Sequence, residues 1–222
     1  MRSTTIAAGL LTRFLAREFD VLFVARDGVA QIGMPRDDGV RLLVVPGSFD
    51  PLHEGHLALA AAAAAALERR DGAARQVVYE LSVANADKGQ VDTTAMTTRL
   101  AQFAAVGAAV ACTRAPLYLD KAALFMPCAF VIGADTASRV LDAKYYDSAA
   151  GGLEGALDAI ASRGCEFVVG GRRSGDDFVP ALEALASLAE DSRHRPLFLA
   201  LDERDFRLDL SSTEIRKRRV QS

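Results

Sequence analysis

The fold of this chain is decided by one stretch of sequence, residues 42–70, which reads LLVVPGSFDPLHEGHLALAAAAAAALERR. The aliphatic run at residues 42–45 predicts a short buried strand. A loop with glycine and proline follows, and the alanine-rich residues 57–70 predict a helix. A buried strand that leads through a loop into a helix is the first half of a strand–helix–strand unit, which indicates a parallel sheet.

The rest of the chain repeats this alternation. Apolar runs predict further strands at residues 77–81, 109–112, 129–132, 166–169 and 197–201. Helical patterns lie between them, at residues 94–106, 153–163 and 180–190. The sequence therefore predicts an α/β protein with a Rossmann-like, doubly wound parallel sheet. Because ligands of such folds bind at the carboxyl ends of the strands, we expect the functional residues in the loops that follow the strands.

Residues 1–40 stand apart as an N-terminal extension of the domain predicted over residues 41–222. Apolar side chains at helical spacing predict one helix, and two short apolar runs, residues 21–24 and 29–32, flank a turn with Asp27 and Gly28. Three interpretations stay open: a cover for the edge of the sheet, a dimer arm, or the remnant of an upstream domain. The sequence leaves a homo-oligomer open.

Composition excludes several classes of protein. An apolar fraction of 50% with 25% charged residues excludes a disordered chain. The longest uncharged apolar run, residues 57–67, falls short of the roughly 20 residues that span a bilayer. A net charge of −3 provides no basic field for nucleic acid. Three cysteines without CxxC spacing indicate neither a disulfide framework nor a zinc site, and no secretory signal is visible, so we expect a reduced, cytoplasmic protein without membrane or nucleic-acid partners.

The loop after the first parallel strand concentrates candidate functional residues. Two of the three histidines, His53 and His56, lie one helical turn apart at the start of the alanine-rich helix. Gly47 would let a ligand approach the backbone closely. Two imidazoles and the amide groups at the positive end of a helix dipole predict a phosphate site. The alternative is a pair of surface histidines that caps the helix. The third histidine, His194, lies on a polar segment and is expected to be replaceable without effect.

A second helix start lies near the C-terminus. Ser211 and Glu214 have the spacing of a capping box. Arg216 follows within the first turn and would add a permanently charged donor for a bound anion. The alternative is a plain helix cap followed by a solvated basic tail at residues 217–219.

Together these two segments resemble the nucleotidyltransferase superfamily. The superfamily's HxGH loop is matched by HEGH at residues 53–56, and its late ISSTxxR-like helix start by LSSTEIR at residues 210–216. The sequence GSFDP at residues 47–51 is similar to the form found in nicotinamide or nicotinate mononucleotide adenylyltransferases. Further matches, which extend the resemblance over about residues 41–219, are SVANADK at 82–88, GADT at 133–136 and Gly171-Arg172.

This resemblance implies a Rossmann-like fold and a reaction. An acceptor phosphate oxygen would attack the α-phosphorus of ATP and release pyrophosphate, with Mg²⁺ held mainly by the substrate phosphates and no dedicated metal-ligand set in the protein. It implies catalytic roles for His53, His56 and Arg216. It implies nucleotide-binding roles for Gly47, Ser48, Phe49, Gly133, Asp135, Arg172, Ser211, Ser212 and Thr213, and contact of Lys88 with the acceptor phosphate.

Two more residues are expected on the acceptor side. Thr113 and Arg114 follow the third predicted parallel strand. Tyr145 and Tyr146 occupy the stretch where the mononucleotide enzymes commonly have a tryptophan. A helix of about three turns after Asp135 would bring Tyr146 to the rim of the pocket, where its ring could stack on a pyridine ring.

Simpler roles are open for several of these residues. Asp135 could be the N-cap of a helix that begins near Thr136, Lys88 a solvated charge, and Arg172 an ion-pair partner of Asp176 or Asp177. Two other functions also stay open: a nucleotide-binding module or slow ATPase without acceptor transfer, and a cytidylyltransferase-like enzyme with another phosphate acceptor.

Overall fold

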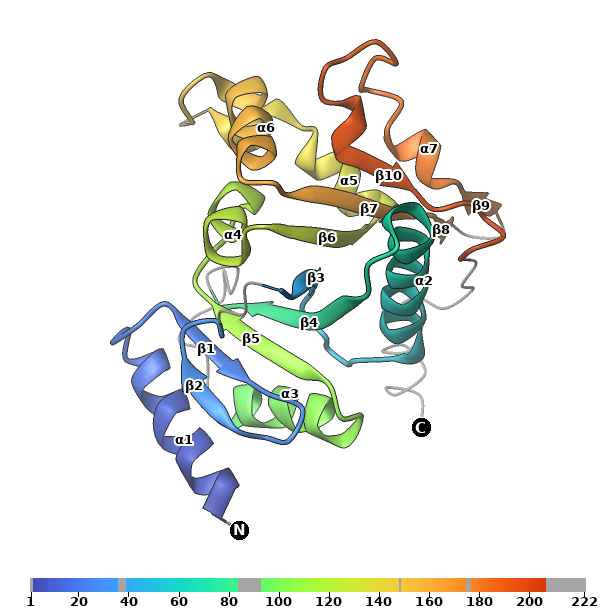
Figure 1. Cartoon of the computed structure of the whole chain (residues 1–222). Helices are drawn as coiled ribbons and strands as arrows, with labels where there is room; N and C mark the ends of the chain where they lie inside the picture. The colour runs from blue at the N-terminus through green and yellow to red at the C-terminus, as the bar shows by residue number, and fades with distance from the viewer. Residues whose placement is uncertain (1, 36–38, 84–92, 148, 175–176, 207–222) are drawn as a thin grey trace.

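A computed structural model describes residues 2–35, 39–83, 93–147, 149–174 and 177–206. Within these residues an eight-stranded sheet has the order β10-β7-β6-β3-β4-β5-β1-β2, which Figure 1 shows from top to bottom. The strands that run parallel are β3 (Arg41–Pro46), β4 (Arg75–Ser82), β5 (Ala109–Thr113), β6 (Cys128–Gly133), β7 (Glu166–Gly170) and β10 (Phe198–Ala200). All six predicted strands are present.

The order of these strands is that of a doubly wound nucleotide-binding sheet. The parallel part of the sheet starts at β3, and the chain then moves outward through β4 and β5 and returns to the other side of β3 for β6, β7 and β10. The direction of winding therefore reverses between β3 and β6. In open α/β sheets ligands bind outside the carboxyl ends of the strands at this reversal. The predicted Rossmann-like fold is confirmed, and it brings the loop after Pro46 beside the loop after Gly133.

Helices cover both faces of the sheet, and alternate side chains of β3 show this. Leu43 and Val45 pack in one cluster with α1 (Arg2–Leu15), α2 (Glu54–Asp71) and α3 (Thr93–Ala105). Val44 points into the opposite cluster, which is formed with α4 (Tyr118–Phe125), α5 (Ala134–Val140), α6 (Gly152–Ser162) and α7 (Ala181–Ala184). A strand buried on both faces has no polar alternation, which explains the continuous apolar run in the sequence.

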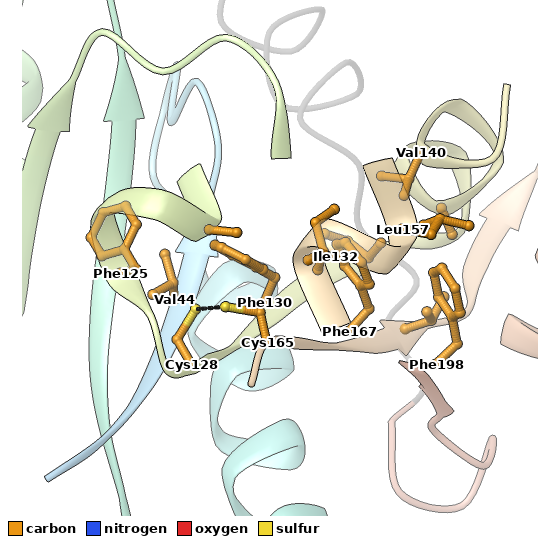
Figure 2. Packing of buried hydrophobic residues seen from close by; sticks show 14 of the residues in the cluster. Val44, Phe125, Cys128, Phe130, Ile132, Val140, Leu157, Cys165, Phe167 and Phe198 are labelled. Carbon is orange, nitrogen blue, oxygen red and sulfur yellow. Dashed lines mark hydrogen bonds between the residues drawn. The ribbon is translucent and has the colours of Figure 1, made fainter. Parts of the chain in front are cut away.

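Aromatic rings fill the second of these clusters. Figure 2 shows Phe125, Phe130, Phe167 and Phe198 there, and the rings of Phe167 and Phe198 stack with their centroids 5.0 Å apart. Each of these rings is at most 7% exposed. The cluster supports the parallel strands from the face opposite α2.

The N-terminal extension continues the sheet. Its hairpin consists of β1 (Val21–Val24) and β2 (Ala30–Ile32), and β1 pairs antiparallel with β5. Helix α1 lies beside this hairpin in Figure 1 and buries Leu11 and Phe14. The extension therefore covers an edge of the parallel sheet.

Arg114 fastens α1 to the end of β5. Its guanidinium lies 4.8 Å from the centroid of the Phe14 ring and donates to the carbonyl oxygen of Phe14 in the last turn of α1. Cations are favourable at the C-terminal end of a helix. Arg114 thus holds the extension instead of projecting toward an acceptor.

The observed helices differ from the predicted ones mainly in length. The predicted helix at residues 180–190 is α7 alone, after which Leu185, Ala186 and Leu188 donate to carbonyls three residues earlier, as in tighter turns. Helix α4 is not predicted, because eight residues are too few to show a helical period. The helix predicted after Asp135 is present as α5, but it begins at Ala134 and ends at Val140 instead of running for about three turns. The described elements also include a small hairpin and two 3₁₀ turns. The hairpin consists of β8 (Arg172–Ser174) and β9 (Asp177–Val179), and the turns are η1 (Ala143–Tyr146) and η2 (Arg195–Leu197). The described helices include none that is long and apolar enough to cross a membrane.

Candidate functional site

The side chain of Phe49 packs into the core and anchors the loop that follows β3. Its ring is 1% exposed and makes edge contacts with the rings of Tyr79 and Phe103, at centroid distances of 5.5 Å and 5.1 Å. A Cβ atom at Gly47 would lie 2.8 Å from this ring, so a side chain at position 47 would displace it. The prediction that Phe49 binds nucleotide is therefore wrong for its side chain, which shapes the loop from the core. Ser48, between these two residues, is exposed at the carboxyl edge of the sheet.

A residue that the sequence analysis missed holds the same loop from α3. The Gln102 side chain accepts from the backbone N–H of Leu52 at 2.9 Å and donates to the carbonyl oxygen of Phe49 at 3.2 Å. One amide therefore satisfies two backbone groups of the loop. Gln102 lies about fifty positions from its partners, so no local pattern in the sequence could indicate this contact.

The two histidines of the loop cap α2 with their Nδ1 atoms. His53 is the N-cap residue, and its Nδ1 accepts from the backbone N–H of Gly55 at 3.1 Å. The Nδ1 of His56 accepts from the backbone N–H of His53 at 3.3 Å. The two rings are stacked with their centroids 3.8 Å apart. The helix-capping interpretation is thus correct for the Nδ1 atom of each ring.

These hydrogen bonds determine the tautomer of both imidazoles. A backbone N–H can only donate, so each Nδ1 must be unprotonated, and a neutral ring then carries its hydrogen on Nε2. Burial lowers the pKa of His53 and lowers that of His56 to about 4, with the neighbouring His53 as a second cause for His56. Near neutral pH both rings are therefore neutral and both Nε2 atoms are hydrogen-bond donors.

The second part of the site lies across the switch point, where β6 leads into α5. Gly133 is the N-cap of α5, and a Cβ atom built on it would meet nothing within 4 Å. Asp135 is exposed in the first turn of α5. The alternative that Asp135 caps a helix from Thr136 is wrong, because the helix already begins at Ala134. A carboxylate and the start of a helix therefore lie at the same edge of the sheet as the histidine loop.

Thr113 is not placed to touch an acceptor. The residue is fully buried, and its hydroxyl donates to Glu80 Oε1 at 2.5 Å and accepts from the backbone N–H of Ala115 at 3.2 Å. Both contacts are internal, so the prediction of an acceptor contact is wrong for this side chain.

Tyr146 is also a core residue. Helix α5 ends at Val140 and the chain turns through η1, so the three helical turns expected after Asp135 do not form. Tyr146 is 2% exposed, and burial raises its pKa to about 12. The prediction of a ring at the pocket rim is wrong, and the exposed neighbour is Tyr145, whose ring lies under Lys144 Nζ at 4.9 Å.

His194 has a structural role that the sequence analysis missed. It is 2% exposed, its Nε2 lies 2.8 Å from Asp158 Oδ1, and its Nδ1 lies 3.3 Å from Glu154 Oε2. These two carboxylates belong to α6, so His194 joins the loop before η2 to that helix. His194 is therefore not the exposed residue that its polar neighbours in sequence indicate, and we expect its replacement to lower stability.

The remaining candidates are only partly described. Arg172 lies in β8, directly after the end of β7. The other candidates lie outside the described residues: Lys88, Ser211, Ser212, Thr213 and Arg216.

A family model matches most of the sequence of this chain. The model for cytidylyltransferase-like proteins matches residues 44–218, from the first core strand through the histidine loop and the switch-point loops to the late serine-rich segment. A comparison with curated proteins found no match. The matched region is most of the chain, and it contains the histidine pair and the start of α5 described above. The chain therefore belongs to the cytidylyltransferase-like family of nucleotidyltransferases.

Proposed function

We propose that this protein transfers the adenylyl group of ATP to the phosphate of nicotinamide mononucleotide or nicotinate mononucleotide and releases pyrophosphate. One observation carries the proposal: two neutral imidazoles stack on each other at the N-terminus of α2, beside the switch point, and Nε2 of each ring is a donor. The resemblance of residues 47–51 to mononucleotide adenylyltransferases supports this choice of substrates.

In this reaction an oxygen of the acceptor phosphate forms a bond to the α-phosphorus of ATP. The bond from that phosphorus to the oxygen bridging to the β-phosphorus breaks, and pyrophosphate leaves with the bridging oxygen and its electron pair. Negative charge develops on the departing oxygens. The Nε2 hydrogens of His53 and His56 and the amides at the start of α2 can donate to them, which is catalysis by preorganised donors. No nucleophilic side chain is required.

Other roles follow from the resemblance. Ser211, Ser212, Thr213 and Arg216 would hold the β- and γ-phosphates, with Gly47, Ser48 and Gly133 close to the nucleotide and Arg172 adding positive charge. Lys88 would meet the acceptor phosphate. Mg²⁺, held mainly by the substrate phosphates, would supply charge neutralisation, and the exposed carboxylate of Asp135 is an oxygen ligand of the type this ion accepts. We also propose that the reaction takes place in the cytoplasm, a proposal that three free thiols support.

The experiment is an assay of pyrophosphate release. Wild-type protein is given ATP or CTP, with Mg²⁺, and either mononucleotide or a panel of other phosphate acceptors. We expect release that depends on ATP and on a mononucleotide. Release that requires CTP would support a cytidylyltransferase with another acceptor, in keeping with the family description. Nucleotide hydrolysis that no acceptor stimulates would favour a nucleotide-binding module with slow ATPase activity.

A further inference from the structure

Two thiols lie in contact at the amino edge of the parallel sheet, opposite the edge that carries the histidine loop. Cys128 is the first residue of β6 and Cys165 directly precedes β7, and their Sγ atoms lie 3.7 Å apart. Figure 2 shows the two side chains pointing toward each other beside the aromatic rings of the core. We call Cys128 and Cys165 the thiol pair.

The sheet holds the thiol pair at the spacing that a disulfide requires. Strands β6 and β7 are parallel neighbours with Ala129 opposite Glu166, so the residues directly before these two also lie side by side. Neighbouring strands are about 4.8 Å apart, and disulfides join residues whose Cα atoms are about 4.4–6.8 Å apart. The Sγ atoms must close from 3.7 Å to about 2.05 Å, which requires rotation of the side chains and no displacement of a strand.

The thiol pair lies one residue below the molecular surface. Cys128 and Cys165 are 6% and 2% exposed, but the residues that precede them, Pro127 and Gly164, are exposed. The two turns that carry these residues touch, because a Cβ atom at Gly164 would lie 3.2 Å from Pro127 Cβ. Local opening of these turns gives a small oxidant access to the sulfur atoms without unfolding of the sheet.

The two thiols differ in acidity. The Cys128 side chain donates a hydrogen bond to the sulfur of Cys165, which lowers the pKa of Cys165, and the positive charge of Arg163 acts in the same direction. Burial raises the pKa of the Cys128 thiol well above its usual range. Because the thiolate is the nucleophile, Cys165 reacts with an oxidant first and Cys128 then attacks the oxidised sulfur.

We propose that a peroxide converts the thiol pair to a reversible disulfide that ties the amino ends of β6 and β7 together. The thiolate of Cys165 attacks one oxygen of hydrogen peroxide, the O–O bond breaks, and the departing hydroxide takes up a proton to become water. Cys165 is then a sulfenic acid. The sulfur of Cys128 attacks it, the S–S bond forms, the S–O bond breaks, and the hydroxide leaves with the Cys128 proton as a second water. The two sulfurs lose two electrons and the peroxide gains them, and a thiol reductant reverses the change.

The disulfide acts on stability. It closes the chain over residues 128–165, and a cross-link across a loop of this length restricts the unfolded chain. Gly133, at the candidate site, lies at the other end of β6, about 16 Å away at the rise of a strand. The inference is therefore independent of the proposed function, and its test needs no measurement of activity.

The test is treatment of folded wild-type protein with hydrogen peroxide, followed by unfolding and alkylation of the remaining thiols. The chain has three cysteines, and we expect one alkylated thiol, at Cys112, with a protein mass lower by two hydrogen atoms before alkylation. Proteolysis without reductant should release one linked pair of peptides, which contains Cys128 and Cys165. The melting temperature should rise by about 5–10 °C and return after dithiothreitol.

Single variants test the two roles within the pair. Cys128→Ser keeps a hydrogen-bond donor to Cys165 but has no second sulfur, so peroxide should add oxygen at Cys165 and give no rise in melting temperature. Cys165→Ala keeps only the thiol with the raised pKa and should consume peroxide at least tenfold more slowly than wild type.

The matched control is Cys112→Ala. Cys112 is fully buried in the cluster on the other face of the sheet, and burial raises its pKa to about 12. This variant should form the disulfide and show the same rise in melting temperature as wild type.

Several results would overturn the inference, and the first of them need only the wild-type protein. Three alkylated thiols after a peroxide treatment that oxidises free cysteine would show that the pair is packing alone. Oxygen added at Cys165 of the wild type without a linked peptide, or a disulfide between two chains, would show that the pair does not close. A linked pair with an unchanged or lower melting temperature would overturn its stabilising role.

Discussion

At the scale of single residues, the histidine pair shows what a sequence can and cannot predict. The spacing of His53 and His56 predicted that both side chains lie together at the start of a helix, and both lie at the start of α2 with their rings stacked. The sequence left helix capping and phosphate binding as alternatives. In the structure each ring caps with Nδ1, which makes Nε2 the donor, so the two interpretations are compatible. A tautomer depends on a hydrogen bond between particular atoms and could not be predicted from residue types.

Two substitutions separate the roles of His56. Asparagine has an oxygen at the same number of bonds from Cβ as Nδ1, so His56→Asn keeps a capping acceptor and loses the Nε2 donor. Glutamine has an NH₂ group at the position of Nε2, so His56→Gln keeps the donor and loses the cap. We expect His56→Asn to melt near wild type with turnover lowered by about 10²–10³, the usual loss for one preorganised donor. His56→Gln should be less stable by about 1 kcal/mol and retain more activity.

Pyrophosphate release and thermal melting of both variants give the answer. If His56→Asn turned over at the wild-type rate, the Nε2 donor would have no part in the reaction. If both variants differed from wild type only in melting temperature, the capping role alone would account for His56.

The low pKa of His56 predicts acid sensitivity. Its pKa is about 4 in the folded protein and 6.5 in its ordinary state, so between these values the unfolded chain binds more protons at this site. The stabilising effect of a neutral His56 is complete above about pH 6.5 and is lost as pH falls toward 4. Asparagine does not titrate, so the stability of His56→Asn relative to wild type should rise by on the order of 1 kcal/mol between pH 7 and pH 4.5. Denaturant unfolding of both proteins at several pH values measures this, and parallel curves would contradict it.

At the scale of elements, contacts between distant segments account for most of what the sequence did not predict. The long periodic helices and the buried strands were predicted because their patterns are local. The roles of Gln102, Thr113 and Tyr146 depend on which element lies beside them, and Phe49 differs because its positive φ of 44° turns the ring under the loop. His194 was misjudged for a similar reason, since its polar neighbours in sequence conceal its burial against α6.

The two hydrogen bonds from Gln102 on α3 to the histidine loop can be tested by substituting Gln102. Gln102→Leu leaves the Leu52 N–H and the Phe49 carbonyl without their side-chain partner, which costs about 1–3 kcal/mol where such groups stay buried. We expect a lower melting temperature together with a raised KM for ATP, because the loop supports both histidines. Gln102→Glu can still accept from Leu52 but cannot donate to Phe49, so its effects should be intermediate. Gln102→Leu with normal ATP binding would show that the loop holds its shape without α3.

At the scale of the whole molecule, the order of the strands assembles the site. The alternation of strands and helices predicted a doubly wound sheet, and ligand binding at its carboxyl edge follows from the topology. The switch point between β3 and β6 could not be located from sequence, because strand order depends on which side of β3 the chain returns to. The same limit left the N-terminal extension with three interpretations, since an edge strand and a free arm have similar apolar patterns.

Removal of residues 1–33 tests whether the extension is part of the core. The truncated chain would expose β5, whose five residues are all buried, as an unpaired edge strand, and would lose the buried side chains of Leu11, Phe14, Leu22 and Phe23. Each large apolar side chain contributes about 1.5–3 kcal/mol when buried, so we expect the melting temperature to fall by more than about 10 °C. An exposed edge also pairs with other chains, so self-association should appear in size-exclusion chromatography with light scattering. Arg114→Met is the milder control: it releases the end of α1 and leaves the hairpin on β5, so it should lower the melting temperature by a few degrees without a change in oligomeric state. A truncated chain that stayed monomeric and melted like the full chain would show that the extension is an independent arm and that residues 41–222 fold without it.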